Sequence, residues 1–145
     1  MEKIYFYSQD QKYGEFSNFA PFGIEMDGIW YPTVEHFYQS QKFIDSDYAE
    51  LIRKVENPKK AAELGKSQKY LIKPDWDEVR LEIMRRAVTK KFTTHSELME
   101  LLMSTGDAEL IENSPFDYFW GCGKDGTGQN NLGKILMQIR DSQEA

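Results

Sequence analysis

The sequence predicts a mainly α-helical (α+β) fold, with a few short strands followed by about five or more helices. Two observations point to this class. Strand-forming residues and a hairpin signal gather before residue 32, whereas helix-start residues and apolar side chains at helical spacing recur after it. The chain has 145 residues, of which 40% are hydrophobic, and no linker or repeat divides it. We therefore expect residues 1–145 to form one compact domain with one core.

The predicted strands lie near the amino terminus. The segment Ile4 to Tyr7 (IYFY) is rich in residues that favour strands. Asp27-Gly28 lies between two short apolar runs, which is the strongest short-range signal for a two-residue hairpin turn. Two or three short strands are expected in this part of the chain.

Five helices are predicted from start and stop signals in the remaining sequence. Each begins at a residue whose side chain can accept a hydrogen bond from the first turn, and the fourth begins at a capping-box pattern. The expected helices cover residues 33–44, 57–65, 75 onward, 94 to just before 106, and about 131 to the end.

Two predictions concern the core. In the third helix Trp76, Val79, Ile83 and Ala87 recur at helical spacing and are expected to point inward. Trp30 lies in an apolar run with a plausible buried side, so we expect it in the core as well.

Charge and cysteine content exclude several classes of protein. The net charge is −6, with 18 basic and 24 acidic residues, which argues against a protein that coats nucleic-acid backbone non-specifically. Cys122 is the only cysteine, so no intramolecular disulfide can form and a reducing compartment is expected. No run resembles a secretion signal or approaches membrane-spanning length. The sequence therefore predicts a cytoplasmic protein without a membrane partner.

The helix TVEHFYQSQKF has an unusual polar face. Glu35, Tyr38, Gln39 and Lys42 fall at spacings of three, four and seven, so a carboxylate, a phenol, an amide and an amine share one side. This face could simply be solvated. The many aromatic neighbours instead indicate partial burial, which would shift the pKa values of Glu35 and Lys42 toward acid–base or nucleophilic use. His36 lies off this face and is expected to be structural, so a two-histidine metal site has little support.

The second unusual segment is the glycine-rich loop WGCGKDGTGQNNLG. Its glycines permit positive φ and close approach to a ligand, and a helix follows whose first N–H groups are expected to be unpaired, which together predict an anion site. The spacing matches neither a P-loop nor a dinucleotide fingerprint. Phe116, Tyr118, Phe119 and Trp120 could form a flat wall for a base, and Asp117 could be a second carboxylate beside Glu35. The alternative is a surface loop with turn glycines and an asparagine cap.

A series of motifs runs through nearly the whole chain in order. They are SNF from Ser17, TVEHFYQSQKF from Thr33, AAELG ending at Gly65, Trp76 with Arg80, KKF from Lys90, and DYFWGCGKDGTGQNNLGKILMQIR from Asp117. Together they resemble the NADAR family, also called the YbiA-like N-glycosidases. The resemblance implies a compact helical domain and a hydrolase that cuts N-glycosidic bonds of phosphorylated ribosyl compounds. It implies two substrate groups, riboflavin-pathway intermediates and ADP-ribose on nucleobases such as guanine, and no metal or organic cofactor.

The chemistry that the resemblance implies suits the predicted catalytic residues Glu35, Lys42 and Asp117. Cleaving a ribosyl C1′–N bond develops positive charge on the sugar and negative charge on the base. In one hypothesis Glu35 stabilises the cation and activates water while Asp117 holds the ribose. In the other, which we favour, Lys42 attacks the ring-opened C1′ and forms a Schiff base while Glu35 moves protons.

Recognition is expected to involve backbone amides of the loop, stacking on an aromatic ring, and polar side chains elsewhere. The alternatives are a non-catalytic module that binds ADP-ribose or a related nucleotide, and a substrate that is ADP-ribosylated nucleic acid rather than a small molecule. The predicted substrate-binding residues are Ser17, Asn18, Tyr38, Gln39, Trp120, Gly121, Gly123, Gly126, Gly128, Asn130 and Asn131.

Overall fold

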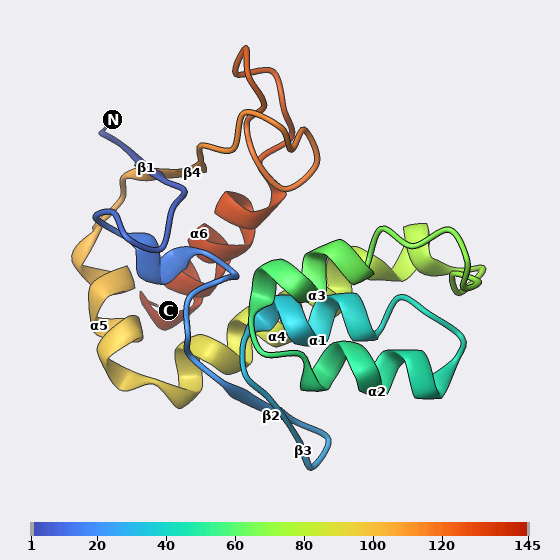
Figure 1. The fold of residues 1–145 in the computed structure, drawn as a ribbon. Helices are drawn as coiled ribbons and strands as arrows, with labels where there is room; N and C mark the ends of the chain where they lie inside the picture. Colours follow the sequence, from blue (N-terminus) through green and yellow to red (C-terminus); the bar gives the residue numbers. More distant parts are fainter. Residues whose placement is uncertain (1, 145) are drawn as a thin grey trace. The chain divides into compact units, whose positions relative to one another are not determined.

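The computed structural model describes residues 2–144 and confirms a mainly helical fold with a few short strands (Figure 1). Backbone contacts divide the chain into two units. One comprises Pro21–Thr94, and the other comprises Met1–Ala20 together with His95–Ala145. The single-domain organisation stays a prediction.

The unit Pro21–Thr94 begins with the predicted hairpin. Strand β2 (Ile24–Met26) pairs antiparallel with β3 (Ile29–Tyr31). Asp27 and Gly28 have φ values of 53° and 83°. Positive φ at both central residues is what a two-residue turn matched to the twist of the strands requires. The hairpin prediction is confirmed.

Three short helices pack together in this unit. Helix α1 (Val34–Ser40) contacts α2 (Ser46–Lys54) and α3 (Pro58–Leu64), as Figure 1 shows. Thr33 caps α1 as predicted, by accepting from the His36 amide, but the helix ends at Ser40 rather than near residue 44. Helix α2 was not predicted. Its apolar residues Tyr48, Leu51 and Ile52 recur at helical spacing after an Asp45 cap, so a local signal was present and was missed.

Helix α4 (Trp76–Thr94) starts directly after Asp75, as predicted, and contacts both α1 and β2. Its buried side differs from the predicted stripe. Val79 and Ile83 are only partly buried. Apolar spacing alone does not say which side of a helix faces the core, and the buried side of α4 also includes the charged residue Lys91. The buried residues of α4 are Trp76, Met84, Ala87, Val88, Lys91 and Phe92.

The core prediction for Trp30 is wrong. Trp30 is 54% exposed, whereas Trp76 is buried as expected. The indole of Trp30 packs on Gly23, where an added Cβ would overlap the ring. The apolar run around Trp30 therefore belongs to a two-stranded hairpin with one face to solvent rather than to a buried strand.

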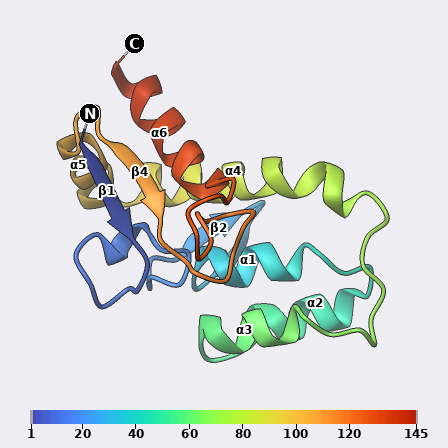
Figure 2. The same ribbon diagram turned by 90° about the horizontal axis from the view of Figure 1, so that it is seen from above.

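The other unit is built on a parallel strand pair. Strand β1 (Lys3–Phe6) pairs in parallel with β4 (Glu109–Glu112), as Figure 2 shows. Strand β4 was not predicted, because it has only four residues and pairs with a segment about a hundred residues away. Helix α6 (Asn131–Glu144) begins where predicted and contacts β4 and α5 (Ser96–Ser104). The unit also contains a short 3-10 helix, η1 (Gly14–Phe16).

The predicted capping box of α5 is wrong. Thr94 is the last residue of α4, so His95 occupies the cap position of α5, and its side chain makes no capping hydrogen bond. The core of this unit joins its strands to α5 and α6 through buried apolar residues, namely Ile4, Phe6, Leu98, Leu102, Leu110, Leu132, Ile135, Leu136 and Ile139. In the described part of the chain, no helix is long and apolar enough to cross a membrane.

Candidate active site

Glu35 lies in the first turn of α1 and is a buried carboxylate, with 8% of the residue exposed. Its Oε2 atom accepts a hydrogen bond of 2.8 Å from Nε2 of Gln39, one turn further along the helix. Burying a carboxylate costs free energy unless hydrogen bonds compensate it, so Gln39 helps to keep this group ordered at its position.

Lys42 follows the end of α1 and is half-buried. Its Nζ atom donates a hydrogen bond of 2.8 Å to the carbonyl of Gly65, the residue directly after α3. Burial lowers the pKa of Lys42 most strongly, the charge of Arg80 lowers it further, and Glu35 and Asp77 act in the opposite direction. A lowered pKa raises the fraction of neutral amine, which is the form that can attack a carbonyl carbon.

The polar face predicted for this helix is thus only partly as expected. Glu35, Gln39 and Lys42 do come together, and they are not the fully solvated row that was the alternative. Tyr38 is buried instead against α4, with its ring centroid 5.0 Å from that of Trp76. The roles of these four residues in binding and catalysis stay predictions.

His36 is a structural histidine, as predicted. Its Nδ1 atom lies 2.8 Å from Oγ1 of Thr33, and its Nε2 atom lies 2.9 Å from the Val55 carbonyl. A carbonyl only accepts, so Nε2 carries the proton and Nδ1 accepts from the threonine hydroxyl. Burial lowers the pKa of His36 despite the opposing contact with Val55. The ring therefore stays neutral.

The glycine loop differs from the predicted amide cradle. The amides of Cys122, Gly126 and Gly128 donate to the carbonyls of Glu112, Gly123 and Cys122. The amides of Lys124 and Thr127 donate to Tyr118 Oη and Asp125 Oδ1. Five of the eight amides from Gly121 to Gly128 are therefore engaged within the protein in this conformation. Positive φ does occur, at Gly123 and Gly126.

The prediction of open amides at the start of α6 is wrong. The amides of Asn131 and Leu132 donate to the carbonyls of Phe119 and Trp120. Asn130, with φ of 53°, uses its side chain to bridge to β4, accepting from the Glu112 amide and donating to the Leu110 carbonyl, each at 2.9 Å. The loop is thereby tied to the strand pair, and the first amides of the helix are already capped.

The aromatic segment before the loop is also folded on itself. Trp120 is buried and meets Phe119 edge to face. The ring of Tyr118 lies on Gly123, where an added Cβ would overlap it. Asp117 Oδ1 accepts from the amides of Phe119 and Trp120, at 2.9 and 2.7 Å. This carboxylate therefore has a local structural task, and its catalytic role stays a prediction.

Ser17 and Asn18 follow η1 and are buried. Ser17 Oγ accepts from the amide of Phe19 at 3.1 Å. With the loop they belong to the unit that contains β1 and β4, whereas Glu35, Gln39 and Lys42 belong to Pro21–Thr94. A pocket shared by these two sets of residues remains a prediction.

Two residues near Lys42 were not assigned a role from the sequence. Arg80 lies one helical turn after Trp76 and acts on the Lys42 pKa. Gly65 supplies the carbonyl that holds the amine. Both stand in motifs that support the family resemblance, which was the only available signal for them.

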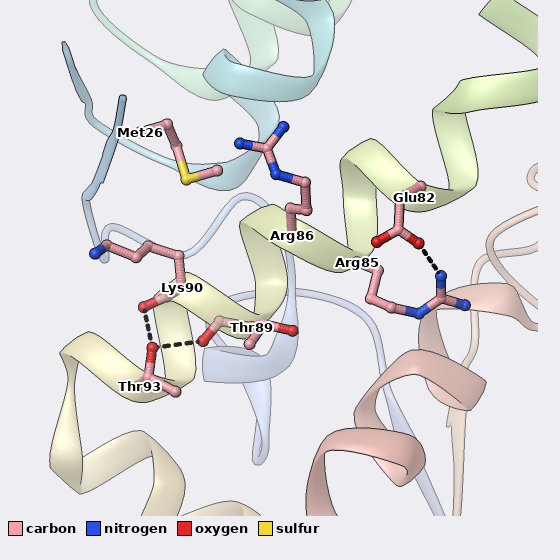
Figure 3. A pocket seen from close by; sticks show the side chains of 7 residues that line it. All are labelled: Met26, Glu82, Arg85, Arg86, Thr89, Lys90 and Thr93. Carbon is pink, nitrogen blue, oxygen red and sulfur yellow. Dashed lines mark hydrogen bonds and ion pairs between the residues drawn. The ribbon is translucent and has the colours of Figure 1, made fainter. Parts of the chain in front are cut away.

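A shallow groove of about 420 Å³ lies along the other side of α4, against Met26 of β2 (Figure 3). It contains three cations, but Arg85 pairs with Glu82 and Arg86 lies 3.5 Å from Asp27. The groove holds no buried acid and amine side by side, so it lacks the chemistry seen at α1. Among the described residues, no group of three or more histidine, cysteine, aspartate or glutamate side chains could hold a metal ion.

Comparisons with known proteins agree with the enzymatic interpretation. An N-glycosidase of Nostoc punctiforme is 50% identical over 95% of this chain and 90% of its own length. N-glycosidase YbiA of Escherichia coli is 44% identical over 95% of this chain and 86% of its own. The NMR structure of E. coli YbiA matches with a TM-score of 0.91 at 42% identity, covering 99% of this chain and 85% of that one. A riboflavin biosynthesis protein of Vibrio vulnificus is 41% identical over 97% of this chain but only 38% of its own.

These likenesses define the class of protein first: an enzyme of the N-glycosyl hydrolase type. They argue against the alternative of a non-catalytic binding module. The NADAR domain model matches residues 5–143. The chain therefore belongs to the NADAR family, as the order of its sequence motifs indicates.

Proposed function

We propose that this enzyme hydrolyses the C1′–N bond of a phosphorylated ribosyl compound, with Glu35 and Lys42 as its catalytic residues. The observation that carries the proposal is the arrangement at α1. A buried carboxylate is held by Gln39, and a nearby amine has its pKa lowered by burial. A buried carboxylate and an amine of lowered pKa, each ordered by a specific contact, are typical of catalytic sites.

The lysine route begins with opening of the ribose ring. The glycosyl nitrogen shares its lone pair with C1′, the C1′–O4′ bond breaks, and O4′ takes a proton that Glu35 can deliver. The neutral Lys42 amine adds to C1′, and a proton passes from the lysine nitrogen to the glycosyl nitrogen. The C1′–N bond then breaks, so the base leaves as a neutral amine and a lysine–C1′ imine forms. Water then adds to the lysine–C1′ imine, which releases the ribose aldehyde and restores the amine. The net reaction consumes one water molecule.

This route restricts the substrate by its chemistry. It requires a glycosyl nitrogen with a lone pair available to C1′, as an exocyclic amine has. The positively charged pyridinium nitrogen of NAD has none. A ribosylaminopyrimidine phosphate of the riboflavin pathway is the first candidate, supported by the name of the V. vulnificus relative. Guanine-linked ADP-ribose, free or on nucleic acid, is the second candidate and rests only on the family resemblance.

A substrate panel tests the proposal. The enzyme is incubated with ribosylaminouracil phosphate, guanine-linked ADP-ribose and NAD, and released base is measured by mass spectrometry. Release from one of the first two and none from NAD is expected. Binding without release from any of the three contradicts the proposed activity. Release from NAD at a comparable rate contradicts the lysine route.

Borohydride trapping tests the covalent step directly. Reduction during turnover should fix the sugar to Lys42 as a stable adduct, which peptide mapping locates. Lys42→Ala is the first control, and Lys54→Ala, which removes an exposed amine on α2 of the same unit, is the matched control. Turnover without any adduct in the wild-type enzyme favours the alternative in which Glu35 activates water.

A further inference from the structure

Gly65, the residue that follows α3, contacts Lys42 and also Gln39, the residue that holds Glu35. The carbonyl of Gly65 accepts the hydrogen bond from Lys42 Nζ at 2.8 Å. The side-chain amide of Gln39, which holds Glu35, packs against the Cα of the same glycine. One backbone position therefore lies between the support of the carboxylate and the support of the amine.

The carbonyl contact follows from the end of a helix. The last carbonyls of a helix have no partner within it and need donors from elsewhere. At the end of α3, Tyr48 Oη donates to the Leu64 carbonyl at 2.6 Å and Lys42 donates to the next one. The position of the amine is thus fixed by where α3 ends.

Glycine is needed at position 65 because of the space around it, and its backbone conformation does not require glycine. Its φ is −65° and its ψ is −15°, values that any residue adopts. An added Cβ, however, would overlap Oε1 of Gln39 and lie 2.5 Å from its Cδ. Gln39 Oε1 is itself buried without a hydrogen-bond partner among the described residues. The glycine makes room for the side-chain amide that donates its hydrogen bond to Glu35.

From these contacts we infer that Gly65 is a positioning residue for catalysis. It leaves the space in which the Gln39 amide lies, and this amide orders the Glu35 carboxylate. This inference rests on the proposed function, since it assigns Glu35 a catalytic role. The missing side chain of Gly65 acts through Gln39, whereas its carbonyl, which accepts from Lys42 Nζ, is a backbone group that alanine would keep.

The structure predicts an unusual phenotype for Gly65→Ala. The atom that must move is the far end of a flexible side chain, and the backbone conformation suits alanine, so the variant should fold with a Tm close to that of the wild type. The displaced amide no longer holds Glu35 in place. A misplacement of about 1 Å at a catalytic group can cost on the order of 10²-fold in rate, so kcat should fall by about this factor.

A double-mutant cycle tests whether Gly65 acts through Gln39. Rates and Tm are measured for Gly65→Ala, Gln39→Ala and the double variant. Gly65→Ala should lower kcat strongly in the wild-type background and by less than about two-fold once the Gln39 side chain is gone. Equal losses in both backgrounds, or full activity of Gly65→Ala, would overturn the inference.

Gly23→Ala is the matched control, because its new Cβ would also overlap a side chain, that of Trp30, in the β2–β3 hairpin. It should leave kcat within about two-fold of wild type, and a loss like that of Gly65→Ala counts against the inference. If the wild-type enzyme releases no base from any candidate substrate, that result contradicts the proposed function instead. In that case the Gln39 side-chain NMR signals still test the contact, and unchanged signals in Gly65→Ala overturn it.

Discussion

The α1 site and the glycine loop both looked functional in the sequence, but in the structure their polar groups are used differently. At α1, reactive side chains are drawn partly out of water, where Gln39 contacts the acid and the Gly65 carbonyl contacts the amine. In the loop, the polar groups that looked available are largely used to fold the loop itself. Side-chain chemistry at an ordered helix is thus better supported as catalytic machinery than backbone chemistry in a loop.

The largest effect should come from Glu35→Gln. The replacement keeps an oxygen that can accept from Gln39, so α1 should remain folded. It removes the proton-transfer group, and such groups contribute typically 10²–10⁴-fold, so kcat should fall by about 10³-fold. Steady-state rates with a Tm measurement check this. Activity within ten-fold of wild type would remove Glu35 from the mechanism and weaken the contrast between the two regions.

A substitution in the glycine loop should lower the stability of the protein more than it lowers kcat. Asn130→Gly keeps the positive φ without strain but loses both side-chain hydrogen bonds to β4. The free energy of unfolding should fall by about 1–3 kcal/mol. Urea denaturation measures this loss. Asn131→Ala, at a neighbouring position without those bonds to β4, serves as the control and should cost less. An unchanged stability with a large loss of kcat would return Asn130 to the binding site.

Arg80→Gln sharpens the account of the amine. Arg80 lowers the pKa of Lys42, so its removal should raise that pKa and reduce the neutral amine near pH 7. The pH at which borohydride trapping of Lys42 reaches half its maximum should move upward. Arg86→Gln removes the same charge from the other side of α4, where it faces Asp27, and should leave the midpoint in place. A downward shift in Arg80→Gln contradicts the electrostatic argument.

The smallest effect concerns His36, which stabilises α1 and has no part in the proposed reaction. Its pKa is lowered in the folded state, so the unfolded chain binds more protons in the window between the two values. Its contribution is fully present above the unfolded pKa of about 6.5 and is lost as the pH falls through the folded value. Unfolding free energies from pH 7.5 down to 5.5 should decline more steeply in wild type than in His36→Gln. Parallel curves would show that His36 does not titrate with unfolding.

The elements with local signals were predictable and those with distant partners were not. The Asp27-Gly28 turn, the Thr33 cap and the start of α6 are each encoded within a few residues. Strand β4 depends on pairing with β1, and the buried face of α4 contains a lysine, so neither has a local pattern. The core prediction for Trp30 was wrong because an apolar run does not show which face of a hairpin is buried.

The candidate site divides in the same way. The helical spacing of Glu35, Gln39 and Lys42 was enough to predict that they come together, although α1 ends before Lys42. The parts of the site that come from other segments, Gly65 and Arg80, could not be found by periodicity, because contacts between helices are set by packing. The prediction for the glycine loop failed for a further reason. Glycine and asparagine are chosen for tight turns as readily as for ligand binding, and sequence alone does not distinguish the two uses.

The pairing of β1 with β4 affects the order in which the chain folds during synthesis. Residues 21–94 are contiguous and hold a hydrophobic cluster of their own, so they can start to fold as soon as they leave the ribosome. The first strand must wait until about a hundred further residues have been synthesised before its partner exists. During that interval its backbone edge is open to wrong partners.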